Sequence, residues 1–392
     1  MFPFLNPNIS YFAESNFREE RKRFGIYQND RLSHMAIFGK TGAGKTTLIE
    51  TLVLQDIVNK RGVFLVDVHG DMSTSLLEQI PKNRKKDVVY IDLSDPKLKW
   101  KYNPLRSVPY EKRSLVASHV LDTLKKLWSS AWGPKMEHIL RYILLSLLDQ
   151  PSAHFSDIIR ILQDKDYRDS CIPNLISSEL RNFWEKEFKN YKPNDLIPIY
   201  NKIGAFVAHP AVKKLLHSNT EELRLGTVMN SQKICILRIA KGDIGQDSSF
   251  LLSSLFINSF ASAAFSRVII PEKNRKPFFI YLDEYPSYMT PNIGIMLSEL
   301  RKFNVGLILA CQHLGMIEPR LKESILGNVG TIICFRLGVH DANYFTKEFY
   351  PIFEASDFTN LANYEIYLRL FILGKASIAF SARTLLYTDI FP

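Results

Sequence analysis

The stretch from Met35 to Leu48 constrains the fold of this chain more than any other. It reads Met-Ala-Ile-Phe-Gly-Lys-Thr-Gly-Ala-Gly-Lys-Thr-Thr-Leu, with an apolar strand candidate at its start and a helical pattern after it. This order of strand, glycine-rich loop, Lys-Thr and helix is typical of a phosphate-binding loop. Glycines let successive backbone N–H groups turn inward around a phosphate chain, and the positive end of the following helix strengthens the attraction. The sequence therefore predicts an α/β nucleotide-binding domain.

The residues of this loop have distinct expected parts in binding a nucleoside triphosphate. Lys45 would reach the β and γ phosphates, and the hydroxyl of Thr46 would take one position on Mg²⁺. The predicted cofactor-binding residues are Gly39, Lys40, Thr41, Gly42, Ala43, Gly44, Lys45, Thr46 and Thr47. ATP and Mg²⁺ are the cofactors that this pattern predicts.

An apolar run that ends in two carboxylates is the second feature with a chemical meaning. The strand candidate that begins at Pro277 is followed at once by Asp283 and Glu284. In NTPases that supply their own base, the first carboxylate holds Mg²⁺ and the second orients and polarises the attacking water. A helix cap or a solvated turn is the alternative. The phosphate loop in the same chain favours Asp283 as metal ligand and Glu284 as catalytic base.

Further polar side chains follow other predicted strands. Gln312 would bond both the γ phosphate and the water, and so sense hydrolysis, or it is a surface polar residue. Arg336 is a candidate arginine finger that reaches a neighbouring subunit, with Arg301 as its competitor and a structural salt bridge as the alternative for both. Three polar residues follow the second strand, Asp67, His69 and Asp71. They would tune the magnesium site, couple it to a neighbouring subunit, or form a hydrogen-bonded loop. The first thirty residues are expected to lead into the sheet across the nucleotide pocket. Arg31 and His34, which follow them, either approach a phosphate or belong to this structural lead-in.

Strand–helix alternation is interrupted in the middle of the chain. From about residue 109 to 218 helical periodicity dominates, which predicts an all-helical insert of ordinary small-domain size. The expected helices are Leu115–Trp128, Lys135–Leu148, Phe155–Leu162, Leu180–Phe188 and Ile199–Leu216. We therefore predict three segments: 1–108 and 219–392 build the nucleotide-binding domain, with a mainly parallel sheet flanked by helices, and 109–218 form the insert.

Composition narrows the setting of this chain. The formal net charge of +10 favours an anionic partner, either nucleic acid or an anionic membrane surface, although a solvated basic exterior would give the same number. The four cysteines show no metal or disulfide spacing, so reduced buried thiols in a cytoplasmic protein are expected. The uncharged stretch 248–266 is interrupted by Ser and Asn, which favours a helix packed on a sheet over a membrane span.

In their order along the chain, these motifs resemble the HerA and FtsK superfamily of DNA-pumping ATPases. Most similar is the cytoplasmic part of the conjugative coupling proteins of type IV secretion systems. The motifs are 39–47, Val66-Asp67-Val68-His69-Gly70-Asp71, Asn103-Pro104-Leu105, Leu282-Asp283-Glu284, Arg301-Lys302 with Gln312, and Phe335-Arg336.

The resemblance implies a RecA-like core, a homo-hexameric ring with nucleotide sites between subunits, and DNA threaded through a basic channel. The insert is similar to the all-alpha domain of those proteins. Coupling proteins typically carry N-terminal membrane helices, and none is visible in this sequence. We therefore expect a cytoplasmic protein without a transmembrane segment of its own, either a soluble relative of those proteins or one recruited to the inner membrane by a membrane or relaxosome-type protein partner.

Three functions follow from these observations. The leading one is an ATP-driven motor that moves DNA of unknown strandedness, with Lys45, Asp283 and Glu284 at the centre of hydrolysis. The second is a secretion or assembly ATPase whose substrate is protein and whose insert is the docking surface. The third is a nucleotide-dependent scaffold that hydrolyses slowly.

Overall fold

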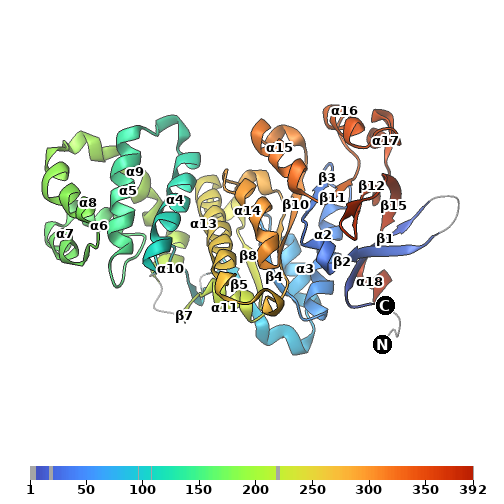
Figure 1. The fold of residues 1–392 in the computed structure, drawn as a ribbon, viewed down its shortest axis with the longest axis horizontal. Coiled ribbons are helices and arrows are strands. Elements are labelled where there is room, and N and C mark those ends of the chain that lie inside the picture. The colour runs from blue at the N-terminus through green and yellow to red at the C-terminus, as the bar shows by residue number, and fades with distance from the viewer. Residues whose placement is uncertain (1–5, 17–20, 96, 107, 218–220, 392) are drawn as a thin grey trace. The chain divides into compact units, whose positions relative to one another are not determined.

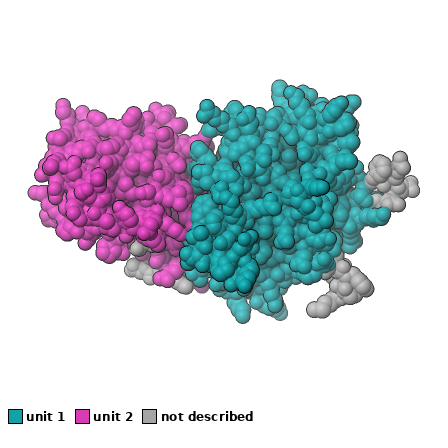
Figure 2. Space-filling view, in the orientation of Figure 1, with its two compact units in different colours: residues 1–90, 225–239, 263–392 teal, residues 91–224, 240–262 magenta. Residues whose placement is uncertain are grey.

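The computed structural model describes residues 6–16, 21–95, 97–106, 108–217 and 221–391. The chain divides into two compact units (Figure 2): residues 1–90, 225–239 and 263–392 form the first, and residues 91–224 and 240–262 form the second. The predicted boundary at residue 218 lies outside the described residues. The three predicted segments therefore stay a prediction, while the two units are described separately below.

Within the described residues, eleven strands form one mixed sheet in the order β2-β1-β15-β12-β11-β3-β10-β9-β4-β8-β5 (Figure 1). These strands are β1 (Ile9–Ser15), β2 (Arg23–Tyr27), β3 (Met35–Phe38), β4 (Gly62–Asp67), β5 (Val88–Asp92), β8 (Ile234–Arg238), β9 (Phe278–Leu282), β10 (Val305–Cys311), β11 (Thr331–Cys334), β12 (Glu365–Arg369) and β15 (Phe380–Thr384). Two short ladders join β6 (Trp100–Lys101) to β7 (Glu221–Glu222) and β13 (Phe371–Ile372) to β14 (Lys375–Ala376).

The middle of the sheet is parallel. Strand β3 lies between β10 and β11, β9 lies between β10 and β4, and β8 follows β4, all with parallel pairing. Every residue of β3, β4, β9, β10 and β11 is buried, as expected for parallel strands covered on both faces. The carboxyl ends of these strands therefore share one edge of the sheet. The predicted fold class, a mainly parallel sheet flanked by helices, is confirmed.

Antiparallel strands extend one side of the sheet. Strand β12 pairs antiparallel with β11, and β15, β1 and β2 continue the sheet in that direction. The expectation that the first thirty residues cross the nucleotide pocket was wrong. The described residues of this segment instead contribute β1 and β2, which pair antiparallel with each other, and β1 also pairs antiparallel with β15.

Helices connect the parallel strands and cover both faces of the sheet. Helix α2 (Lys45–Val58) and α3 (Asp71–Gln79) contact each other, as do α14 (Ile293–Glu299) and α15 (Pro319–Asn328). The crossovers that contain α2 and α3 run along the sheet toward β5, whereas those that contain α14 and α15 run toward β2. Because such crossovers are right-handed, the two pairs of helices lie on opposite faces of the sheet. The remaining helices of this unit are α1 (Gln28–Arg31), α11 (Leu225–Asn230), α16 (Val339–Glu348), α17 (Ala355–Asn360) and α18 (Tyr387–Ile390).

A buried ion pair anchors α2 to the rest of this unit. The fully buried guanidinium of Arg31 donates two parallel hydrogen bonds to Asp56, at 2.8 and 3.0 Å, and stacks 3.9 Å from the ring centre of Phe279. Arg61 donates a further bond of 3.0 Å to the same carboxylate. Removing one partner of such a pair leaves an uncompensated buried charge, which typically costs about 3–5 kcal/mol. Arg31 is therefore a structural residue and not a phosphate ligand.

Helices dominate the second unit. They are α4 (Tyr110–Leu127), α5 (Pro134–Leu148), α6 (Asp157–Gln163), α7 (Lys165–Cys171), α8 (Ser178–Asn182), α9 (Pro193–Ala208), α10 (Pro210–His217) and α12 (Lys241–Ile244). The predicted single helix Ile199–Leu216 was wrong. It is interrupted at His209, whose ψ of 127° is extended, because the residue before Pro210 is forced out of the helical region.

Helix α13 (Gln246–Phe265) contains all but the last residue of the uncharged stretch noted in the sequence. By length and hydropathy the segment Gln246–Ile269 is the one candidate membrane span among the described residues, and 78% of its apolar window is buried in the folded chain. A core helix of a folded protein passes the same test. Its polar side chains contact α4, where Asn258 donates to the hydroxyl of Thr123 at 3.1 Å. Packing of this helix on the sheet stays a prediction.

His34 is a buried neutral imidazole that makes folding dependent on pH. Its Nδ1 accepts from the amide of Leu307 at 3.0 Å, so its Nε2, 3.0 Å from the carbonyl of Leu297, carries the proton. Burial lowers the pKa of His34 from 6.5 to about 4, and the charge of Arg301 adds to the effect. Because the unfolded chain binds this proton more readily, stability is fully present above about pH 6.5 and falls as the pH drops toward 4.

We expect His34→Asn, which tolerates the positive φ of 67° at this position, to flatten that dependence. Between about pH 7.5 and 5.5 the free energy of unfolding of the wild type should fall by about 1 kcal/mol more than that of the variant. Denaturant titrations at both pH values measure the difference. Other titrating groups are shared by the two proteins and cancel, so equal pH slopes would contradict this role of His34.

Candidate nucleotide-binding site

A cavity of about 520 Å³ lies at the edge of the sheet where the parallel strands end. Its lining comes from the loop after β3, the segment after β4, the ends of β9 and β10, and the turn before β12. The residues that line it are Thr41, Gly42, Gly44, Lys45, Thr46, Thr47, His69, Asp283, Glu284, Gln312 and Tyr364. The parallel register of the strands thus brings most of the sequence-predicted site residues into one space.

The phosphate loop is fixed by backbone hydrogen bonds to three neighbouring segments. The amide of Lys40 donates to the carbonyl of Arg336 at 2.9 Å, and the carbonyl of Ala43 accepts from the amide of Tyr364 at 2.9 Å. The amide of Gly39 donates to Cys311 at 3.2 Å. These bonds hold both ends of the loop, so that its middle faces the cavity.

Glycine is required at two positions of the loop for different reasons. A Cβ at Gly39 would lie 2.6 Å from the Cβ of Phe335, which leaves no room for a side chain. Gly44 has a φ of +120°, and a Cβ there would lie 2.9 Å from the ring of Tyr364. Close strand packing and a left-handed turn therefore both depend on the absence of side chains.

Lys45 begins α2 and points back over the loop. Its Nζ donates to the carbonyls of Gly39, at 2.7 Å, and Lys40, at 3.1 Å. Burial lowers the pKa of Lys45, while the carboxylates of Asp283 and Glu284 oppose that effect. Hydrogen bonds to the loop thus hold the ammonium group beside the space that a phosphate chain would occupy.

Asp283 and Glu284 follow β9 and differ in their surroundings. Burial raises the pKa of Asp283 to about 6, with Lys45 opposing the rise and Glu284 adding to it. The backbone carbonyl of Asp283 accepts from the hydroxyl of Tyr288. Glu284 has a φ of +50°, a strained value for a residue with a side chain, and such outliers cluster at functional sites.

Both carboxylate oxygens of Glu284 have partners in this structure. Oε1 accepts from the amide nitrogen of Gln312, and Oε2 lies 3.0 Å from Nε2 of His69. Asp67, two residues before His69, accepts instead from the amides of Gly70 and Ser73 at the start of α3, at 2.8 and 2.7 Å. The hydrogen-bonded loop expected as the alternative for Asp67 is therefore what the structure shows.

Several predicted residues lie outside the cavity lining. Gly39, Lys40 and Ala43 contribute backbone contacts to the back of the loop rather than side chains to the space. The guanidinium of Arg336 donates to the carbonyl of Leu361 at 3.4 Å, although its own carbonyl touches the loop. Arg301 is exposed, and its charge acts on His34, which precedes β3 at the opposite edge of the sheet.

Tyr364 is the lining residue that sequence reasoning missed. It has a φ of +70° in the turn before β12, donates to the loop and packs its ring against Gly44. No local motif marks it, because its place depends on the antiparallel strands that carry the distant C-terminal segment beside the loop.

Other proteins are similar to this chain in sequence and in fold. A family model described as the central domain of helicase HerA matches residues 24–203, from β2 into α9. The type 4 coupling protein DotL of Legionella pneumophila (strain Philadelphia 1) is 22% identical over 417 residues, which cover 88% of this chain and 52% of that protein. The chain is thus similar to the HerA central domain over residues 24–203 and to a type IV coupling protein over most of its length. It spans about half the length of DotL.

Solved structures share the fold of this chain. The bacterial conjugative coupling protein TrwBdeltaN70, in an unbound form, matches with a TM-score of 0.68 at 12% identity, covering 93% of this chain and 88% of that one. TrwB has also been solved in complex with ADP and Mg²⁺. VirB4 of Thermoanaerobacter pseudethanolicus matches with a TM-score of 0.64 at 17% identity, covering 97% of both chains.

Proposed function

We propose that this protein binds ATP with Mg²⁺ in the cavity beside the phosphate loop and hydrolyses it. The observation that carries the proposal is that Lys45, Asp283 and Glu284 line one cavity. The structure of TrwB with ADP and Mg²⁺ supports the choice of ligand. The hydroxyl of Thr46 and the carboxylate of Asp283 are the hard oxygen ligands that Mg²⁺ prefers, and they would hold it. When bound, Mg²⁺ neutralises charge on the phosphate oxygens.

In this proposal each side chain of the cavity has a separate role in hydrolysis. Loop amides and Lys45 bind and orient the phosphates, which requires Lys45 to leave the carbonyls of Gly39 and Lys40. Glu284 polarises the attacking water and accepts its proton once an oxygen is released from Gln312 or His69. Gln312, which touches that base, is placed to respond to the γ phosphate.

We further propose that the chain works as a DNA-moving coupling motor in a homo-hexameric ring. Two proteins similar to this chain, DotL and TrwB, are named as coupling proteins. TrwB is described as a conjugative coupling protein and as a plasmid coupling protein. Among the described lining residues there is no arginine, so an arginine finger would have to come from another segment or subunit. Recruitment to the inner membrane through a protein partner remains part of the proposal.

Stimulation by DNA tests the motor function. We expect single-stranded or double-stranded DNA to raise the rate of ATP hydrolysis at low salt, and the effect to fall steeply as salt is added, because phosphate contacts release counterions. Steady-state phosphate release is the measurement. If neither DNA binds nor raises the rate, the motor proposal fails, and stimulation by a secreted protein instead would favour the protein-substrate ATPase.

Replacing the base separates binding from turnover. Glu284→Gln should lower the rate of hydrolysis by about a hundredfold or more, while the affinity for a fluorescent ATP analogue stays near that of the wild type. Glu299→Gln is the matched control, since Glu299 pairs with Lys302 away from the cavity. A rate in Glu284→Gln equal to that of the control would move the base to another residue.

Mixing two inactive variants tests whether Arg336 acts in a neighbouring site. Rings that contain Arg336→Ala and Lys45→Ala subunits include interfaces with an intact loop on one side and an intact arginine on the other. We expect the mixture to recover part of the ATPase activity that each variant lacks alone. The same mixture with Arg301→Ala tests the competing residue. Recovery with Arg301→Ala but not with Arg336→Ala would reassign the finger.

A further inference from the structure

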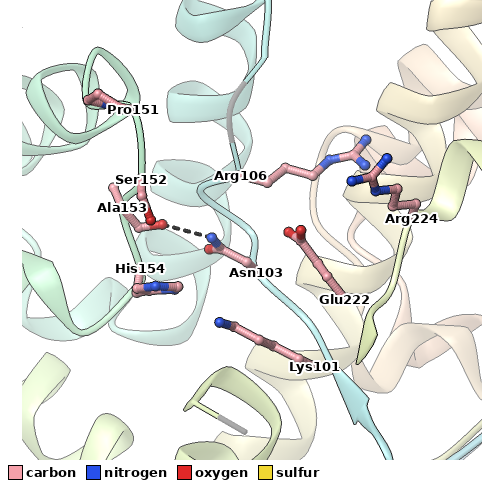
Figure 3. A pocket seen from close by; sticks show the side chains of 9 residues that line it. All are labelled: Lys101, Asn103, Arg106, Pro151, Ser152, Ala153, His154, Glu222 and Arg224. Carbon is pink, nitrogen blue, oxygen red and sulfur yellow. Dashed lines mark hydrogen bonds between the residues drawn. The ribbon is translucent and has the colours of Figure 1, made fainter. Parts of the chain in front are cut away.

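The second unit contains a cavity of about 470 Å³ with a lining of its own (Figure 3). Lys101 lies in β6, paired in register with Glu222 of β7, and Arg106 follows the turn after β6. Arg224 lies two residues beyond β7, and the loop from Pro151 to His154 closes another wall. All of these residues belong to one compact unit, and none of them lines the cavity beside the phosphate loop.

The wall of this cavity is held by hydrogen bonds to buried groups. Asn103 is buried, and its amide nitrogen donates to the carbonyl of Ala153 at 2.7 Å while its oxygen accepts from the amide of Leu105 at 3.0 Å. The amide of Leu223 donates to the carbonyl of Lys101 at 2.8 Å. These bonds join the segment after β6 to the 151–154 loop and the end of β6 to the segment after β7, so three walls of the cavity are bonded to one another.

Positive charge in this cavity exceeds negative charge. Lys101, Arg106 and Arg224 line it against one carboxylate, Glu222. Within the described part of the chain, none of the three basic side chains forms an ion pair. Figure 3 shows the guanidinium groups of Arg106 and Arg224 pointing toward each other. Like charges that face one another repel, and an anion between them would reverse the sign of the interaction.

We propose that this cavity is a binding site for a phosphate group, separate from the phosphate loop. A single guanidinium satisfies the two coplanar oxygens of a carboxylate through one bidentate pair. Two guanidiniums that approach from different directions, with an ammonium as a third donor, instead suit the tetrahedral oxygens of a phosphate. The phosphate comes from a nucleic-acid strand or from a small phosphorylated ligand, and both sources present the same chemistry to Arg106 and Arg224.

Two probes distinguish these sources: a fluorescein-labelled oligothymidylate and inorganic phosphate, each titrated with ADP and Mg²⁺ present to fill the phosphate loop. Arg106→Ala with Arg224→Ala should weaken binding of at least one probe by about tenfold. For the oligonucleotide, the slope of log affinity against log salt should also fall in magnitude by about 0.7, the contribution of the one phosphate of a single strand that the site neutralises. If the arginine variant binds only one of the two probes more weakly, that probe identifies the source of the phosphate.

The matched control is Lys186→Ala with Lys189→Ala, which removes the same charge from exposed positions of this unit outside the cavity. Unchanged binding of both probes in the arginine variant, or equal loss in the control, would overturn the proposal. Unlabelled polyglutamate and unlabelled oligothymidylate can each be tested as competitors of the labelled oligothymidylate. If polyglutamate displaces it equally well, a phosphate group is not what the cavity selects, and that part of the proposal is overturned.

Two further variants keep the test decisive if the double alanine variant does not fold. Glu222→Gln removes the one carboxylate and should tighten binding of the same probe several-fold, a gain that a purely structural role of the cavity does not produce. Arg106→Lys with Arg224→Lys keeps the charge but loses the bidentate fork, and should bind more weakly with a nearly unchanged salt slope. Weaker binding by Glu222→Gln would contradict the site.

Discussion

Parallel pairing of β3, β9 and β10 is the constraint on which the rest of the structure depends. It brings the end of each strand to the same edge, so that the phosphate loop, Asp283, Glu284 and Gln312 meet although they are spread over more than two hundred residues. A single reversed strand would carry its polar residues to the opposite edge. The site is therefore a consequence of topology first and of side-chain chemistry second.

Two features outside the parallel strands stabilise this arrangement. The buried pair of Arg31 with Asp56 joins the start of the chain to α2, the helix whose first residue is Lys45. On the other side, the antiparallel strands bring Tyr364 against Gly44 and bond it to Ala43. The loop is thus braced by segments from both ends of the chain, while the carboxylate of Glu284 is held by Gln312 and His69.

Sequence patterns predicted the parts of this fold that depend on local or strongly periodic signals. Continuous apolar runs predicted the buried parallel strands, and the glycine pattern predicted the loop and the start of α2 at Lys45. The β1–β2 hairpin, the break at Pro210 and the place of Tyr364 escaped prediction for physical reasons. Edge strands are partly exposed and weakly patterned, a proline can begin a helix as well as end one, and Tyr364 reaches the site only through long-range pairing.

The most direct test of this account is a structure of the protein with Mg²⁺ and a non-hydrolysable ATP analogue. It should show the triphosphate along residues 41–47, with Nζ of Lys45 moved from the carbonyls of Gly39 and Lys40 to the phosphate oxygens. Mg²⁺ should lie between Thr46 and Asp283, and Glu284 should face the γ phosphate with at least one oxygen released. A nucleotide bound elsewhere, or a triphosphate in this cavity that Lys45 does not contact, would contradict the account.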